Sequence, residues 1–279
     1  MIINSTEPEL IPYWQNRLSV TAWLHRDGIW SSRRLRKGHG PLWGRHYQRL
    51  NLHQIIRSLF SVKRIKRLEV STAIAFIVGP FLFALGSFVS LVSTSNFNTS
   101  SALLAIGSIF FTAGGFWQLQ QARIATKKLP KNTRSWKWCG FRCAATQSAG
   151  TILFNVNTFF LWAYPRSSEY SWLILVIFPN FVGSVLFLIS AMEGLLEVGH
   201  GKLLVYEPMH LGWWIAIVNG LGCLWFMQSA VADLPVSFHS LSVINIEMSI
   251  RTTLMGSIAF LVVGILSLAE CSEDEHATT

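Results

Sequence analysis

Residues 171–192 read SWLILVIFPNFVGSVLFLISAM, a run of 22 residues that contains no charged side chain. A helix that crosses the roughly 30 Å of hydrocarbon in a bilayer needs about 20 predominantly apolar residues. Because lipid cannot hydrogen-bond the backbone N–H and C=O groups, a single spanning segment of this kind must be helical. The stretch therefore predicts a transmembrane helix.

Five further stretches have a similar length and composition. They lie at 71–94, 101–122, 143–164, 212–231 and 250–269. Charged residues make up only 13% of the chain, which is about half of their usual share in soluble domains. Segment 143–164 is the most polar, so we expect it to face protein rather than lipid. The predicted fold class is an all-α polytopic membrane protein with six transmembrane helices.

Lysine and arginine gather on one side of these predicted spans. Residues 1–70 carry 13 of them and residues 123–142 carry seven, whereas residues 95–100 carry none. The cytoplasmic flanks of membrane spans are enriched in Lys and Arg. Both termini are therefore predicted to be cytoplasmic, and the plasma membrane is the expected location.

The predicted organisation has three parts: a basic cytoplasmic region at 1–70, a transmembrane domain at 71–270 and an acidic cytoplasmic tail at 271–279. Residues 46–69 have an apolar side and a basic side, and they predict an amphipathic helix on the anionic lipids of the inner leaflet. The alternative is that this helix docks onto a cytoplasmic protein partner. The net charge of +9 does not indicate nucleic acid, because no fingerprint of a nucleic-acid-binding module is present.

A short motif, G-S-[IV]-x-F, recurs in three of the predicted spans. Its shared residues are Gly107, Ser108, Phe111, Gly183, Ser184, Phe187, Gly256, Ser257 and Phe260. The spans that precede these carry weaker counterparts, which begin at Gly79, Gly150 and Gly220. Such a period predicts an internal repeat. The repeat unit is a two-helix hairpin used three times in tandem, at 71–122, 143–192 and 212–269.

The glycine and the phenylalanine of the motif lie four residues apart, on one ridge of a helix. Small residues on such a ridge let two helix backbones approach closely in a membrane. We interpret the motif as a helix-packing element; the alternative is that it lines a pore or contacts a substrate. The hairpin, with this motif and a terminal Glu on its second helix, resembles the YrhK-like membrane domain of uncharacterised multi-pass membrane proteins. The resemblance implies architecture only, because that family has no established activity.

A polar residue stands fourteen positions after each motif glycine: Gln121, Glu197 and Glu270. The simplest interpretation is that this position reaches the inner interface, where water solvates a carboxylate. The alternative is a ring of polar groups at one depth that binds a cation or a proton. Glu193, one turn before Glu197, is the deepest acidic candidate.

Asn155 and Asn157 lie within the most polar span. Amides inside a membrane commonly hydrogen-bond between helices, and contact with a solute is the alternative. No nucleophile–base pair, metal-binding motif or phosphate-binding loop is present in the sequence, which argues against an enzyme. We therefore expect no metal and no cofactor.

The function expected from the sequence is a non-enzymatic role by assembly or interaction in the bilayer, as a homo-oligomer or with a protein partner. The alternative is a small transporter or channel for a cation, a proton or a small solute. In that case the carboxylates and amides named above would contact the transported species.

Overall fold

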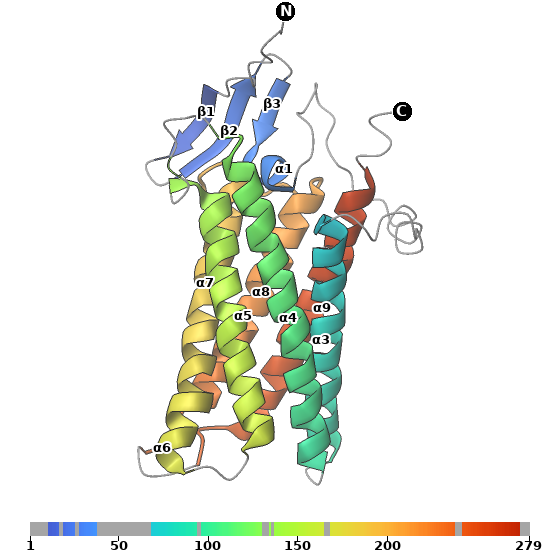
Figure 1. The fold of residues 1–279 in the computed structure, drawn as a ribbon, viewed down its shortest axis with the longest axis vertical. Helices are drawn as coiled ribbons and strands as arrows, with labels where there is room; N and C mark the ends of the chain where they lie inside the picture. The colour runs from blue at the N-terminus through green and yellow to red at the C-terminus, as the bar shows by residue number, and fades with distance from the viewer. Residues whose placement is uncertain are drawn as a thin grey trace, which may run out of the picture.

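The computed structural model of the chain describes residues 11–16, 19–25, 28–37, 68–93, 96–129, 134, 137–164, 168–237 and 242–273. Within these residues the fold is mostly helical, with a small β-sheet at the N-terminal side. Figure 1 shows the sheet at one end of a long helix bundle, together with the short helix α1 (Ser32–Lys37) and the C-terminal turns of the last helix. This end is termed the sheet end, and the opposite one the far end.

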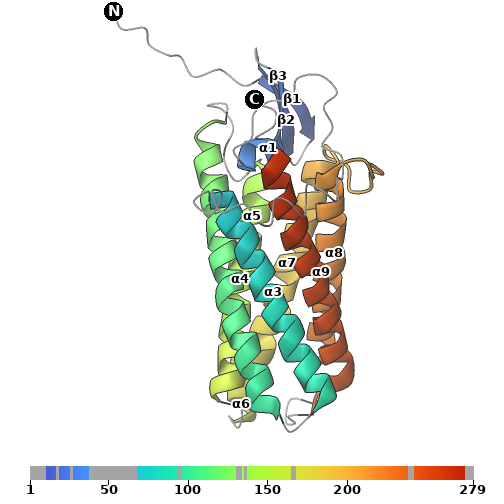
Figure 2. The ribbon, with the colours of Figure 1, turned by 90° about the vertical axis from the view of Figure 1, so that its right-hand side faces the viewer.

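The described part of the bundle contains six long helices: α3 (Leu68–Val92), α4 (Phe97–Thr126), α5 (Cys139–Ala163), α7 (Phe178–Val198), α8 (Leu211–Ala232) and α9 (Ile246–Glu273). Each packs against two neighbours in the order α3, α4, α5, α7, α8, α9 and back to α3, so the helices form a closed ring. Figure 2 shows the helices running along the length of the bundle. The short helix α6 (Glu169–Trp172) and the π-helical turn η4 (Leu173–Ile177) lead directly into α7. The π-turn ends just before Pro179, which lacks the N–H that a regular turn would use.

The protein is a multi-pass membrane protein by the length and composition of its helices. Among the described residues, five helical stretches are long and apolar enough to cross a bilayer: Leu68–Val92, Phe97–Thr126, Glu169–Val198, Leu211–Ala232 and Ile246–Cys271. Of the six predicted spans, five are therefore confirmed as candidate spans by this criterion. The segment predicted at 143–164 is α5, which is 25 residues long but too polar to qualify.

The prediction of an all-α fold is wrong in the N-terminal region. Three strands, β1 (Ile11–Asn16), β2 (Ser19–His25) and β3 (Gly28–Ser31), form an antiparallel sheet in sequence order. Strand β2 has four consecutive buried residues, Val20 to Trp23, so it lacks the alternation of apolar and polar residues that identifies a half-exposed strand. The pattern that sequence reasoning relies on is therefore absent from this strand.

Two other predicted segments fall largely outside the described residues. Of the predicted amphipathic helix at 46–69, only Leu68 and Glu69 are described, as the first residues of α3. Of the predicted acidic tail at 271–279, residues 271–273 are the last residues of α9, and the rest is not described. Neither prediction is tested.

The sheet is joined to the bundle by a hydrophobic cluster. Trp23 of β2 and Trp138, which precedes α5, are both fully buried, and their rings meet edge to face at 6.2 Å. Leu35 of α1 and small residues near the ends of α4 and α5 complete the cluster: Ala122, Ala125, Cys139 and Ala144. The sheet and α1 are thus packed onto the bundle.

A close approach between glycines recurs in three helix pairs. The pairs are Gly79 with Gly107, Gly150 with Gly183, and Gly222 with Gly256. In each pair, a Cβ added to one glycine would lie 2.9 to 3.3 Å from the carbonyl oxygen of the other. The sequence predicts that Gly220 is the α8 member of the third pair, but the structure places Gly222 there, two residues later. A Cβ added to Gly220 would lie 4.0 Å from its nearest neighbouring atom, so no helix approaches it closely.

One turn after each of these glycines, a buried phenylalanine crosses the axis of the bundle. The six residues, termed the aromatic layer, are Phe83, Phe111, Phe154, Phe187, Phe226 and Phe260. Their rings interlock: Phe226 stacks on Phe260 at 5.2 Å between centroids, and Phe83 meets Phe111 edge to face at 5.2 Å. Aromatic pairs in these geometries contribute about 0.5 to 1.5 kcal/mol each beyond area burial. The motif that the sequence marks thus builds the centre of the bundle.

Candidate functional site

The aromatic layer separates two cavities on the axis of the bundle. Phe83, Phe154 and Phe226, from α3, α5 and α8, line a cavity toward the far end. Phe111 and Phe260, from α4 and α9, line a second cavity toward the sheet end. The two are termed the far cavity and the sheet-end cavity.

The far cavity has a volume of about 310 Å³ and is lined mainly by hydroxyl-bearing and aromatic side chains. All six long helices contribute to it. Its polar lining residues are Ser87, Ser90, Ser93, Ser100, Ser101, Asn157, Thr158, Asn180, Ser229, Asp233, Ser249 and Thr253. Cavities of roughly 300 Å³ or more that combine apolar walls with a few placed polar groups are typical of small-molecule sites.

The sheet-end cavity is smaller, at about 90 Å³, and its lining includes both charged and amide side chains. Gln118, Gln121 and Gln147 lie along its wall, and the helix α1 contributes Arg33, Arg36 and Lys37. The side-chain oxygen of Gln118 is buried and has no hydrogen-bond partner among the described residues. Helix α1 therefore lies across the sheet end of the axis.

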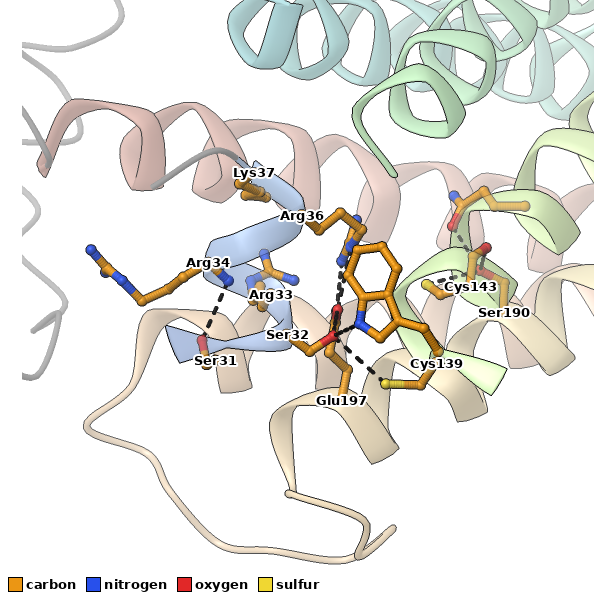
Figure 3. Close-up of polar contacts among 12 residues, drawn as sticks. Ser31, Ser32, Arg33, Arg34, Arg36, Lys37, Cys139, Cys143, Ser190 and Glu197 are labelled. Atoms are coloured by element: carbon orange, nitrogen blue, oxygen red, sulfur yellow. Dashed lines mark hydrogen bonds and ion pairs between the residues drawn. The ribbon is translucent and has the colours of Figure 1, made fainter. Parts of the chain in front are cut away.

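Helix α1 is attached to α7 by a buried ion pair (Figure 3). Arg36 Nη2 lies 2.7 Å from Glu197 Oε2, and the two side chains are 4% and 0% exposed. The other carboxylate oxygen, Oε1, accepts a hydrogen bond of 2.6 Å from Ser32 Oγ. Because a buried charge without a partner is very unfavourable, these contacts fix α1 against α7.

A second ion pair attaches α1 to α9. Arg33 donates through Nε to Glu270 Oε1 and through Nη2 to Glu270 Oε2, both at 2.7 Å. Lys37 also pairs with Glu270 Oε2. This two-point geometry is specific to arginine, whose planar fork matches a carboxylate. The six residues of α1 thus bind the ends of two helices that are far apart in sequence.

Ser32 connects the ion pair to the hydrophobic cluster beneath the sheet. Its hydroxyl accepts a 2.6 Å hydrogen bond from Trp138 Nε1 while it donates to Glu197. The indole N–H of Trp138, which is fully buried, is therefore satisfied. Helix α1, Trp138 and α7 are therefore linked by one continuous polar network.

Both arginines of this network are held in the charged form. Burial disfavours the charged guanidinium of Arg36, but the adjacent carboxylate of Glu197 outweighs that effect and raises the pKa of Arg36. Burial opposes the charge on Arg33 in the same way, and Glu270 raises its pKa. Deprotonation of the arginines therefore does not break these ion pairs.

The structure places the predicted polar positions at the sheet end, but it does not bring them into contact with one another. Glu197 and Glu270 contact α1, as described above, and Gln121 Nε2 lies 3.4 Å from Thr72 Oγ1. Glu193 forms a two-point ion pair with Arg142 of α5, with both N···O distances at 2.7 Å. A cation at these carboxylates would have to displace arginines, so the site considered below does not use them.

The two predicted asparagines have different environments. Asn155 Nδ2 donates to Thr112 Oγ1 of α4 at 3.2 Å, an interhelical hydrogen bond. Asn157 is buried and lines the far cavity. The motif residues surround the aromatic layer: Ser108 Oγ accepts from Thr158 at 2.8 Å, and Ser184 Oγ donates to the Phe226 carbonyl at 3.3 Å.

Sequence reasoning missed two parts of this site. The sequence places residues 32–37 within the basic region 1–70, but their partners lie more than 160 residues away, at Glu197 and Glu270. Asp233 was not singled out, although it lines the far cavity. The available signal was that Asp233 is the first charged residue after the apolar stretch 212–231.

Comparison with known protein families, with curated proteins and with solved structures finds no match. The function of the site must therefore be inferred from its geometry.

Proposed function

We propose that the protein is a six-span membrane protein that binds a small polar solute in the far cavity and carries it across the bilayer. The observation that supports this proposal is the arrangement of two polar cavities on one axis, on opposite sides of a single aromatic layer. Such an arrangement suits a carrier. A solute bound in one cavity would reach the other cavity if the side chains of the aromatic layer moved apart.

The sixth span in this proposal is α5, and the orientation of its side chains supports it. The polar residues Gln147, Ser148 and Thr158 are buried within the bundle. The outward residues Ile152 and Phe159 are apolar and are 53% and 45% exposed. A helix whose polar groups all face protein can cross a membrane despite a low mean hydropathy.

The proposal also includes three tandem hairpins, α3–α4, α5–α7 and α8–α9, with both termini in the cytoplasm of a cell and the bundle in the plasma membrane. The recurrent glycine pairs and phenylalanines support the hairpin repeat. The resemblance to the YrhK-like membrane domain stays a prediction, as does contact of the basic N-terminal region with anionic lipids. Lys and Arg in the flanks support the orientation.

A second candidate is the assembly or interaction role expected first from the sequence. The observation that favours it is the interlocked state of the aromatic layer, which is buried and leaves the two cavities separate. A bundle that never opens would serve as a structural or partner-binding element of the membrane. Flux measurements distinguish the two candidates.

The test is solute flux into proteoliposomes, measured by light scattering after an osmotic step with glycerol, urea or small ammonium salts. We expect at least one solute to enter faster than it enters protein-free vesicles. Leu161→Trp, which places a larger side chain in the wall of the far cavity, is expected to reduce that flux.

The matched control is Phe159→Trp on the same helix, because Phe159 is 45% exposed on the outer surface of the bundle. This variant should keep the wild-type flux. Equal rates for wild type and empty vesicles with every solute would contradict transport and favour the assembly role. Wild-type flux in Leu161→Trp would contradict passage through the far cavity, and an equal loss in both variants would show that the loss does not arise in the cavity.

A further inference from the structure

We propose that the far cavity binds a small hydroxylated organic amine, whose ammonium group is held at Asp233. This inference names the substrate class of the cavity in the proposed function, and in that sense it rests on that function. It is argued from three observations. These are the charge in the cavity lining, a buried N–H group that has no hydrogen-bond partner among the described residues, and the aromatic side chains that form the floor of the cavity.

Asp233 carries the only formal charge among the described residues that line the far cavity. It follows the last residue of α8, and its Oδ2 accepts a 3.0 Å hydrogen bond from Asn180 Nδ2 of α7. No described Lys or Arg lines the cavity. A carboxylate in a largely buried site without a cation is unfavourable, and an ammonium ligand would remove that penalty.

The charged residues at the start of α9 do not supply this cation. Arg251 pairs with Glu247 on the same helix, and both are about two-thirds exposed. Neither of them lines the far cavity. The groups that face Asp233 from α7 and α9 are the neutral side chains Asn180 and Ser249.

Burial raises the pKa of Asp233 to about 6, although hydrogen bonds from Ser249 and Asn180 partly oppose the shift. The carboxyl group is therefore ionised at pH 8 and mostly protonated at pH 5. An aliphatic amine keeps its proton over this whole range, because its pKa is near that of Lys, about 10.4. Binding that depends on Asp233 should consequently weaken as the pH falls.

A second and independent observation is the indole of Trp172, the last residue of α6. Its Nε1 is buried and has no hydrogen-bond partner among the described residues, and Trp172 lines the cavity. A buried indole N–H normally finds an acceptor. A ligand hydroxyl oxygen would satisfy it, and this is why the ligand should carry a hydroxyl as well as an amine.

The floor and walls favour an organic molecule over a metal ion. Phe83, Phe154 and Phe226 form the floor at the aromatic layer. Phe226 of α8 lies seven residues before Asp233, which corresponds to about 10 Å along a helix. A short aliphatic chain can occupy this distance, and aromatic faces also attract organic cations. Groups of three or more His, Cys, Asp or Glu residues that could hold a metal are absent from the described residues.

The test is calorimetric titration of the full chain in detergent with 4-amino-1-butanol. The matched ligands are 1,4-butanediol, which lacks the ammonium, and butylamine, which lacks the hydroxyl. We expect 4-amino-1-butanol to bind at pH 8, butylamine to bind more weakly and 1,4-butanediol not to bind detectably. Binding at pH 5 should be weaker by about tenfold, since only about one tenth of a carboxyl with a pKa near 6 is ionised there.

The decisive variant is Asp233→Asn, which keeps the shape and removes the charge. It should weaken binding of the amino alcohol by about tenfold or more, and Trp172→Phe should remove the difference between 4-amino-1-butanol and butylamine. Glu247→Gln removes an acidic charge from the same end of the bundle without changing the cavity, and it should bind as the wild type does. If Asp233→Asn does not fold, Trp172→Phe and the pH series still test the site.

Equal affinity for the amine and the diol, or the same loss of affinity in Glu247→Gln as in Asp233→Asn, would overturn the assignment. Flux without amine binding would refute the ligand class and leave transport intact. Amine binding without any flux would refute transport and leave the binding site intact. The two proposals can therefore fail separately.

Discussion

Replacing Glu197 by alanine is expected to lower the free energy of unfolding in detergent by about 3 to 5 kcal/mol. The carboxylate is fully buried and accepts hydrogen bonds from Arg36 and Ser32 of α1. Its removal leaves the guanidinium of Arg36 buried without a counter-charge, and that desolvated charge is the main source of the loss. The measurement is unfolding in a mild detergent, followed by circular dichroism.

Two further variants separate this mechanism from a general loss of charge. Glu247→Ala removes a carboxylate that is 65% exposed and pairs with Arg251, so a change within about 0.5 kcal/mol is expected. The double variant Arg36→Met with Glu197→Leu removes both buried charges, and it should recover most of the stability. If the double variant were as unstable as Glu197→Ala alone, the unpaired arginine would not be the cause.

Gly264→Ala is expected to destabilise the bundle by about 1 to 3 kcal/mol or more. A Cβ at this position in α9 would lie 2.4 Å from the carbonyl oxygen of Phe76 and 2.8 Å from its carbonyl carbon, both backbone atoms of α3. Backbone atoms cannot move aside as a flexible side chain can, so the two helices must separate. Thermal unfolding in detergent measures the effect.

Gly220→Ala is the matched control, because it adds the same methyl group to another helix of the bundle. The nearest atom to its Cβ would be Leu195 Cδ1 at 4.0 Å, so no clash arises. Alanine is favoured over glycine inside a helix by about 0.8 to 1.0 kcal/mol, and the variant should be as stable as the wild type or more so. Similar losses in the two variants would contradict the packing described here.

The helical part of the fold could be predicted because its signal is local. Each of the six long helices coincides with an apolar stretch of the sequence, and the G-S-[IV]-x-F motif marks where the aromatic layer forms. Length and polarity of a segment are sufficient for such a prediction. The exact partner in α8, Gly222, could not be predicted, because one helix offers several small residues and only packing selects among them.

The sheet and the two cavities depend on contacts that the sequence does not display. Four successive residues of strand β2 are buried, so its sequence lacks the alternation of apolar and polar residues by which a half-exposed strand is recognised. The arginines of α1 find partners near the ends of α7 and α9, which are brought together only when the ring of helices closes. The polar lining of the far cavity is distributed over all six long helices, so no single segment carries its signature.

The measurement that tests the central claim most directly is thiol labelling of the reconstituted protein from each side of the membrane. Two variants are made in a background without the four native cysteines: Ser90→Cys in the far cavity and Ser267→Cys in the sheet-end cavity. A membrane-impermeant maleimide should label Ser90→Cys from one side only and Ser267→Cys from the opposite side only. Labelling of both from the same side, or of either only after detergent is added, would contradict the account.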